Sequence, residues 1–308
     1  MNSADSWDLG HFVHLDKHKY RKQRKELEKL WRDDAFLVNP DAKVADRTIY
    51  KYWKNRRTLF SLMGVKRLYL TKELWFSVTP ETVAKFVARF IRSCLPEAHT
   101  VVDVFCGGGG NSIQLAMYFP KVYGVDCSVE HLYCTYRNAQ AYGVEDRIWL
   151  KYGDWRKLSR RGRFERVKVD CVFASPPWGG PGYQKEEVFD LETGLAPVGL
   201  REMLRGFLRI SSNVVLFLPR NSDLAQISRV TRELLGDDAR CKVLYVKTGE
   251  YMKGILCFWG EPFYNYSQGS EAAVGNVHDV GDGKHSNEDG VQHARESLSV
   301  AIDYSEDG

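Results

Sequence analysis

A buried strand that breaks into four consecutive glycines is the feature that most constrains the fold of this chain. Residues 100–105, TVVDVF, have the β-branched, apolar composition of an internal strand, and Gly107–Gly110 follow after one cysteine. Residues 111–118 have the apolar positions of a helix, and the next strand, KVYGVD, ends at Asp126, 23 positions after Asp103. This order predicts the nucleotide-binding end of an α/β unit.

The glycine loop and the acid that follows it favour a particular kind of ligand. Glycines have no β-carbon, so they allow the backbone to approach a ligand closely. An acid at the tip of the second strand suits hydrogen bonding to a ribose diol. The run DxFxGxG lacks the first glycine of G-x-G-x-x-G, which favours a methyl donor over a dinucleotide. Asp154 and Trp155, after the strand RIWLKY, are placed to frame an adenine.

A second motif, SPPWGGP at Ser175–Pro181, follows the short apolar strand VDCVFA. Two prolines remove backbone donors, so the carbonyls of Ser175 and Pro176 stay free to accept hydrogen bonds from a substrate amine. The indole of Trp178 suits stacking on a cationic, N-methylated purine. Together with the glycine loop, this motif predicts methyl transfer from S-adenosyl-L-methionine to an amino group of a planar base.

Six runs of this sequence resemble the trimethylguanosine synthase family of RNA cap hypermethylases. They are YWKNRRTLF, WFSVTPE, DVFCGGGGN, GVD, SPPWGGP and FLPRNSD, and the resemblance covers about residues 45–262. It implies an α/β fold, namely a class I, Rossmann-like methyltransferase with a mostly parallel central sheet and an N-terminal α-helical extension. The implied reaction places two methyl groups on the exocyclic 2-amino group of a 7-methylguanosine RNA cap.

The resemblance also implies roles for individual residues. Trp178 is implied to stack on the cap base, with Ser175 and Pro176 beside the amine as catalytic residues. The implied contacts to S-adenosyl-L-methionine are Phe60, Thr79, Asp103, Gly107, Gly109, Asn111, Asp126, Asp154 and Trp155. The positions expected to touch the cap phosphates are Lys51, Tyr183, Arg220 and Asn221.

Charge and composition predict one catalytic domain with two appendages. We expect a basic, partly disordered N-terminal segment at residues 1–44, a helical extension at 45–95, a methyltransferase domain at 96–264 and a disordered acidic tail at 265–308. The tail has nine acidic and two basic residues, and the remainder has 42 basic and 31 acidic residues, a net charge of +11. A basic core favours a nucleic-acid partner, and Lys17–Arg32 has eight Lys or Arg against two Glu.

The cysteines predict neither disulfides nor a metal site. Seven cysteines show no C-x-x-C and no His/Cys cluster. We therefore expect reduced thiols, an intracellular location, no bound metal and no membrane span. The family resemblance adds partners and a place: capped small nuclear and small nucleolar RNAs, the RNP proteins of those particles, and the nucleus, specifically the nucleolus.

Two alternatives stay open at this point. The chain could be a cap-binding or RNP-assembly module that keeps the fold without turnover, or an enzyme of the same fold that acts on an adenine or DNA amine. Donor binding distinguishes the first, and a comparison of 7-methylguanosine cap, unmethylated cap and adenosine as acceptors distinguishes the second.

Overall fold

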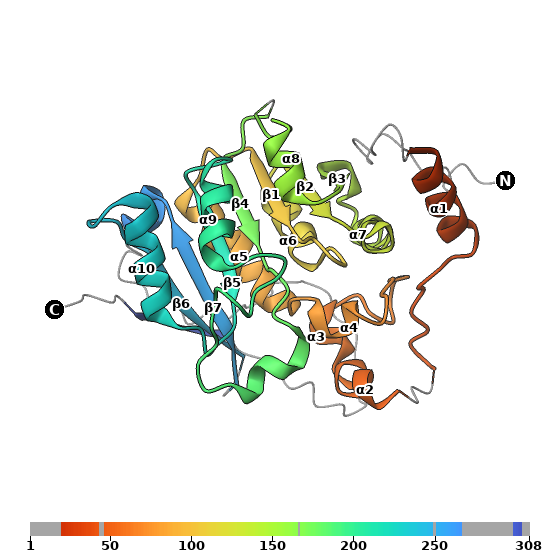
Figure 1. Cartoon of the computed structure of the whole chain (residues 1–308). Helices are drawn as coiled ribbons and strands as arrows, with labels where there is room; N and C mark the ends of the chain where they lie inside the picture. Colours follow the sequence, from red (N-terminus) through yellow and green to blue (C-terminus); the bar gives the residue numbers. More distant parts are fainter. Residues whose placement is uncertain (1–19, 43–45, 166, 249–250, 267–297, 304–308) are drawn as a thin grey trace, which may run out of the picture.

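The computed structural model describes residues 20–42, 46–165, 167–248, 251–266 and 298–303, and its centre is one mixed sheet (Figure 1). The strand order is β3-β2-β1-β4-β5-β7-β6-β8. The first five strands in this order run parallel, and the others run antiparallel to their neighbours. The strands are β1 Thr100–Val104, β2 Lys121–Asp126, β3 Ile148–Tyr152, β4 Cys171–Ala174, β5 Val214–Leu218, β6 Lys242–Thr248, β7 Tyr251–Trp259 and β8 Leu298–Asp303.

Helices precede the sheet in the chain and then alternate with its strands. The preceding helices are α1 Tyr20–Arg32, α2 Arg47–Lys54, α3 Arg56–Leu59, α4 Leu74–Ser77 and α5 Glu81–Cys94. The later ones are α6 Gly110–Tyr118, α7 Val129–Tyr142, η3 Glu145–Arg147, α8 Trp155–Arg160, η4 Gly180–Lys185, α9 Leu200–Leu208, α10 Leu224–Leu235 and α11 Glu261–Tyr264. The expected mostly parallel sheet with an N-terminal helical extension is therefore confirmed.

Both faces of the parallel strands are covered by helices, so β1, β4 and β5 are buried along their whole length. Val101 and Phe173 belong to the core that includes α5, α6 and α7. Val102 follows Val101 on β1, and Val172 precedes Phe173 on β4. Both valines belong to the core that includes α8, α9 and α10. This alternation explains why these strands read as continuous apolar runs rather than as polar–apolar repeats.

The sheet brings the predicted motifs to one edge. β1 is central: it pairs in parallel with β2 on one side, where Val104 lies opposite Val125, and with β4 on the other, where Val104 lies opposite Ala174. The glycine loop, the Asp126 tip and the SPPW segment therefore leave three adjacent strands at their carboxyl ends, which is where ligands bind in open α/β sheets.

The apolar spacing of the sequence predicts a helix over Glu81–Cys94, and α5 has these bounds, but its N-cap differs by one residue from the predicted one. The run Thr79–Pro80–Glu81 is a typical helix start, and it favours Thr79 as the N-cap. In the structure Pro80 is the N-cap, and the Thr79 hydroxyl instead accepts a hydrogen bond from Asn111 Nδ2 at 3.0 Å. The Thr79 hydroxyl therefore makes a tertiary contact to α6 instead of capping α5.

The extension is fixed to α7 by polar contacts. The buried amide of Asn138 accepts from the Tyr69 backbone N–H at 2.7 Å, and donates to the Tyr69 carbonyl at 3.0 Å and the Gly108 carbonyl at 2.9 Å. The Arg137 guanidinium lies 4.3 Å from the Trp31 ring and 4.4 Å from the Tyr69 ring. In this way α7 holds α1, the extension and the glycine loop together.

The C-terminal segment departs from its expected disorder at one place. Residues 298–303 form β8, which pairs antiparallel with β6. The sequence LSVAID alternates apolar and polar or small residues with the period of a strand, a pattern that the acidic composition of the segment conceals. Residues 267–297 and 304–308 lie outside the described residues, as do residues 1–19 of the basic N-terminal segment.

Among the described residues, no helix combines the length and apolar character needed to cross a bilayer. The described His, Cys, Asp and Glu side chains form no group of three or more that would hold a metal ion.

Replacing Gly109 by alanine should destabilise the fold more than the same change at Gly143. Both residues have positive φ, +85° and +67°, so both variants incur a left-handed backbone penalty of about 1–2 kcal/mol. A β-carbon at Gly109 would also lie 3.0 Å from Thr135 Cγ2, whereas nothing lies within 4 Å of one at Gly143. We expect an additional loss of about 1–3 kcal/mol for Gly109→Ala in urea unfolding. Equal losses for the two variants would contradict the packing of the loop on α7.

Candidate active site

The N-terminal extension covers the glycine loop. A β-carbon on Gly108 would lie 3.2 Å from side-chain atoms of Leu74 and Val78, and one on Gly110 would lie 3.0 Å from Val78 Cγ1. The sequence predicts that glycines serve close approach of a ligand. At Gly108 and Gly110 the space of the missing β-carbon is filled instead by the extension. These two glycines allow the extension to pack directly on the loop backbone.

Two buried oxygens beside the loop have no donor in the described part of the chain. Asp103 is fully buried, and its Oδ2 accepts from Ser112 Oγ at 2.5 Å while Oδ1 has no partner. Asn111 donates through Nδ2 to Thr79, and its Oδ1 has no partner. Buried acceptors without donors are rare in folded proteins. These two fit a ligand that carries hydrogen-bond donors, as the ammonium group of S-adenosyl-L-methionine does.

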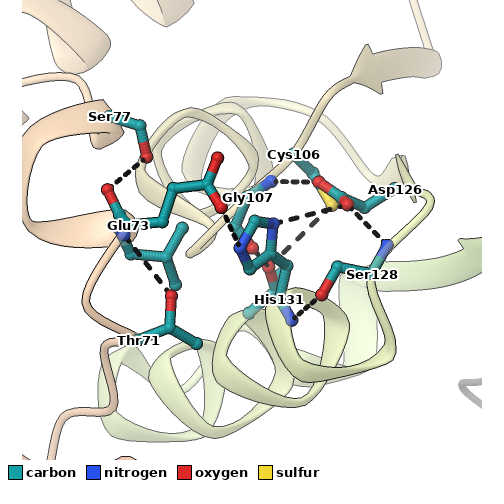
Figure 2. Close-up of polar contacts among 10 residues, drawn as sticks. Thr71, Glu73, Ser77, Cys106, Gly107, Asp126, Ser128 and His131 are labelled. Carbon is teal, nitrogen blue, oxygen red and sulfur yellow. Dashed lines mark hydrogen bonds and ion pairs between the residues drawn. The ribbon is translucent and has the colours of Figure 1, made fainter. Parts of the chain in front are cut away.

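Asp126 lies at the tip of β2, as predicted, and its carboxylate is held by the loops on either side (Figure 2). Oδ2 accepts from the Gly107 backbone N–H at 3.0 Å, and Oδ1 accepts from the Ser128 backbone N–H at 2.9 Å. The Gly107 carbonyl in turn accepts from Thr135 Oγ1 at 2.6 Å. The carboxylate is thereby oriented at the edge of the glycine loop.

The sequence reasoning missed His131, which contacts this carboxylate. His131 is in the first turn of α7, where its backbone N–H donates to the N-cap Ser128, and its Nδ1 lies 3.4 Å from Asp126 Oδ1. Its Nε2 lies 3.7 Å from Glu73 Oε2, just before α4 (Figure 2). One feature of the sequence could have identified His131. It is a titratable residue in the first turn of the helix that follows the strand ending at Asp126, and a side chain at that position faces back toward the acid.

Two residues expected to touch the methyl donor are core side chains. Trp155 is 3% exposed, and its ring centroid lies 4.6 Å from that of Phe207 on α9, so its expected contact with the adenine stays a prediction. An aromatic at the start of α8 is turned into the sheet by the apolar surface beneath it. Phe60 is 2% exposed and packs on Tyr142 of α7, with a centroid distance of 6.1 Å.

Asp154 lies at the correct edge of the sheet but has a protein partner. It is the N-cap of α8, and its carboxylate accepts from the Arg156 backbone N–H at 2.9 Å and from the Arg156 guanidinium at 2.8 Å. The hydrogen bond from Arg156 holds the pKa of Asp154 below its ordinary value. The preceding Gly153 donates to the Asp126 carbonyl at 2.8 Å, so the two acids stand at neighbouring strand ends.

The SPPW segment continues directly from β4 and places Trp178 at the same edge of the sheet as the glycine loop. Pro176 is buried, whereas Ser175 and Trp178 are half-buried. The Trp178 ring meets the rings of Tyr183 and Phe217 edge to face, at centroid distances of 5.2 Å and 5.3 Å. Its indole nitrogen is buried without a partner among the described residues. The tryptophan is therefore packed against two aromatic rings.

The four residues expected to contact phosphates come from three elements. Asn221 Nδ2 donates to the carbonyls of Tyr183 and Glu186, at 3.2 Å and 2.8 Å, and so fixes η4 against the end of β5. Arg220, the preceding residue, is exposed. Lys51 is exposed on α2, and α4 contacts both α2 and η4. The structure thus brings α2, η4 and the β5 end to the same side as Trp178.

Comparison with known proteins agrees with this geometry. A family model described as "RNA cap guanine-N2 methyltransferase" matches residues 98–262. A protein of Saccharomyces cerevisiae called trimethylguanosine synthase is 53% identical over 266 residues, which are 84% of each chain. The protein of that name from Schizosaccharomyces pombe is 33% identical over 183 residues, covering 59% of this chain and 75% of its own.

A solved structure supports the fold independently. The crystal structure of a putative methyltransferase from Porphyromonas gingivalis matches 81% of this chain and 60% of its own, with a TM-score of 0.53 and 15% identity. At that identity the likeness speaks for the methyltransferase fold alone.

The Asp103→Asn variant should be more stable than the unmodified chain at pH 8. Burial raises the pKa of Asp103 to about 7, despite the hydrogen bond from Ser112. Between pH 3.8, the ordinary pKa, and about 7, the folded chain holds a proton that the unfolded chain has released, so this group's contribution to stability falls as pH rises through that window. An uncharged amide removes that loss, which we expect to be worth about 1–4 kcal/mol at pH 8 and much less at pH 5.

Thermal unfolding at the two pH values measures this difference, and Asp170→Asn is the matched control. Asp170 accepts from the backbone N–H groups of His99 and Thr100 at 2.8 Å and 2.9 Å, so its amide should lower stability. A less stable Asp103→Asn at pH 8, or a difference that does not change with pH, would contradict burial of an uncompensated charge. The same variant should bind S-adenosylhomocysteine more weakly.

Proposed function

This chain belongs to the RNA cap guanine-N2 methyltransferases, and on that premise we propose that it completes the 2,2,7-trimethylguanosine cap of small nuclear and small nucleolar RNAs. It is an S-adenosyl-L-methionine-dependent enzyme that methylates the exocyclic 2-amino group of guanine in an RNA cap. In the proposed reaction that amino group receives two methyl groups in separate steps.

One structural observation supports the assignment most directly. The glycine loop and the SPPW segment leave adjacent parallel strands, with Val104 paired to Ala174. A methyl donor on the loop and an amine beside Ser175 and Pro176 would therefore lie next to each other. The main contribution of the protein to the proposed reaction is to hold the two in this position. Positioning of this kind can supply several kcal/mol of the barrier.

The donor side of the proposed site is made of acceptor groups. Bound S-adenosyl-L-methionine supplies an activated methyl group that a nitrogen lone pair can accept. Asp126 would accept from the ribose hydroxyls, since three donors orient its carboxylate. Asp103 and Asn111 would accept from the ammonium group through the oxygens that have no partner in the described part of the chain.

The acceptor side of the proposed site orients the base. Trp178, fixed by Tyr183 and Phe217, would stack on the 7-methylguanine ring. The carbonyls of Ser175 and Pro176 would accept from the 2-amino group and keep its lone pair directed at the donor. The proton of that amine can leave to water once the nitrogen carries the new bond, so no protein base is required.

The phosphates of the cap would be held by cations and polar groups around this ring. Lys51 on α2 and Arg220 after β5 are exposed cationic side chains, and Tyr183 lies between these elements. Asn221 acts on this side mainly through the η4 backbone, which it fixes by two hydrogen bonds. Phosphate contacts are common to all caps, so they contribute affinity without selecting the base.

Trp178→Ala should abolish methylation of a 7-methylguanosine cap analogue while S-adenosylhomocysteine affinity changes less than about twofold. The indole is expected to hold the base and not the donor, and one stacked base is worth about 1–3 kcal/mol before orientation is counted. Trp178→Phe is the control, because it keeps an aromatic face between Tyr183 and Phe217. More than about half of the original activity in the alanine variant would remove Trp178 from the proposed site.

The same assay should show selection for the methylated cap. The charge of 7-methylguanine over an indole gains about 0.5–2 kcal/mol, a factor of roughly 2 to 30 in affinity. Catalytic efficiency should fall further than affinity when the 7-methyl group is absent, because the amine is then misplaced. Equal efficiency with both caps would favour a general guanine methylator, and methylation of adenosine would favour the adenine-acting alternative.

The RNA class and the location extend this proposal. The basic helix α1 supports an RNA partner, and the family resemblance supports small nuclear and small nucleolar RNAs, their RNP proteins, and the nucleus and nucleolus. Depleting the protein should remove trimethylguanosine from those RNAs, as measured by cap-specific immunoprecipitation and sequencing, and a fluorescent fusion should mark the nucleolus. Unchanged caps on both RNA classes would contradict the proposed substrates.

A further inference from the structure

His131 joins two parts of the molecule that are 53 residues apart in the sequence. On one side its Nδ1 lies 3.4 Å from Asp126 Oδ1, at the tip of β2. On the other its Nε2 lies 3.7 Å from Glu73 Oε2, at the N-terminal end of α4 in the extension. Figure 2 shows the imidazole between the two carboxylates, which come from different parts of the fold.

The backbone on both sides of this contact is fixed, so the imidazole has little freedom. Ser77 Oγ donates to the Glu73 carbonyl at 3.1 Å, and Ser128 Oγ accepts from the His131 backbone N–H at 3.1 Å. The side chains of His131 and Asp126 are 15% and 10% exposed, whereas that of Glu73 is 63% exposed. The contact between His131 and Asp126 is thus shielded from water, whereas the contact between His131 and Glu73 lies at the solvent-exposed edge of this group.

The surroundings favour the charged imidazolium. Burial acts to lower the pKa of His131, but the hydrogen bond and charge of Asp126, with the charges of Glu73 and of Glu130 on α7, outweigh it and raise the pKa above 6.5. These three carboxylates are the charged groups that face the ring from β2, from the start of α4 and from α7 itself. An imidazolium donates from both nitrogens, so it can join both acids at once.

We propose that His131 is a positioning residue that ties the ribose-binding acid Asp126 to Glu73 of the extension, so that donor binding and docking of the extension depend on each other. This rests on the proposed role of Asp126 in the donor site. His131 orients the Asp126 carboxylate together with the Gly107 and Ser128 amides, and it holds the extension closed over the glycine loop. Loss of the proton removes one of the two contacts, so the donor should bind best below the pKa of His131 and more weakly above it.

Calorimetric titration of the full chain with S-adenosylhomocysteine at pH 6 and pH 9 tests this link without any turnover. Asp103, whose pKa burial raises to about 7, titrates between these values with or without His131, so affinity is compared as the ratio of the unmodified chain to His131→Gln. We expect this ratio to fall roughly three- to tenfold from pH 6 to pH 9, the range of a partly shielded ion pair. His131→Gln should have the weaker affinity at both pH values. His99→Gln is the matched control, because His99 is exposed at the opposite end of β1.

The Glu73→Gln variant is the second test of the proposed link, in the same binding experiment. It leaves the Asp126 contact in place, so it should lose part of the affinity, and the losses in Glu73→Gln and His131→Gln should not add in the double variant. A His131→Gln variant with unchanged affinity at pH 6, an affinity ratio to the unmodified chain that is the same at pH 6 and pH 9, or additive losses would overturn the link. Asp126→Asn separates the two hypotheses: unchanged donor affinity in that variant refutes the proposed donor site itself, whereas weakened affinity beside an unaffected His131→Gln refutes only the role of His131.

Discussion

Direct packing of the extension on the backbone of the glycine loop is the constraint on which the rest of this site depends. Leu74 and Val78 reach the loop only because Gly108 and Gly110 have no side chain. The same approach lets Asn138 hydrogen bond to Tyr69 and to the loop at once. The donor site is therefore built from two segments that are separated by the whole of α5.

This arrangement explains why the site carries uncompensated polar groups. Asp103 and Asn111 are buried beside the loop, and one oxygen of each has no donor among the residues that the structure describes. Such groups destabilise the empty fold, and a ligand that supplies the missing donors stabilises it. The site is thus organised for a cationic, donor-rich molecule before that molecule arrives, at the expense of stability in its absence.

Local patterns predicted the parts of the structure that depend on neighbours in the sequence. The strand before the glycines, the Asp126 tip and the bounds of α5 follow from period and composition, and they agree with the structure. The packing of Trp155 on Phe207 could not be predicted, because the two sides of a helix start look alike in sequence and only the apolar surface under α8 decides which one an aromatic faces. His131 was missed because its partner Glu73 comes from a distant segment. The packing of the extension on Gly108 and Gly110 could not be predicted for the same reason.

The order of the segments along the chain has a consequence for synthesis on the ribosome. The extension emerges first, but the helix that fixes it, α7, carries Thr135 and Asn138 about 60 residues after Val78. At 5–20 residues per second this gap lasts about 3–12 s, and the glycine loop, about 30 residues after Val78, is made halfway through it. Until α7 follows, the loop lacks the Thr135 and Asn138 contacts that fix it, so the apolar face that later closes the donor site is open to proteases and to aggregation during synthesis.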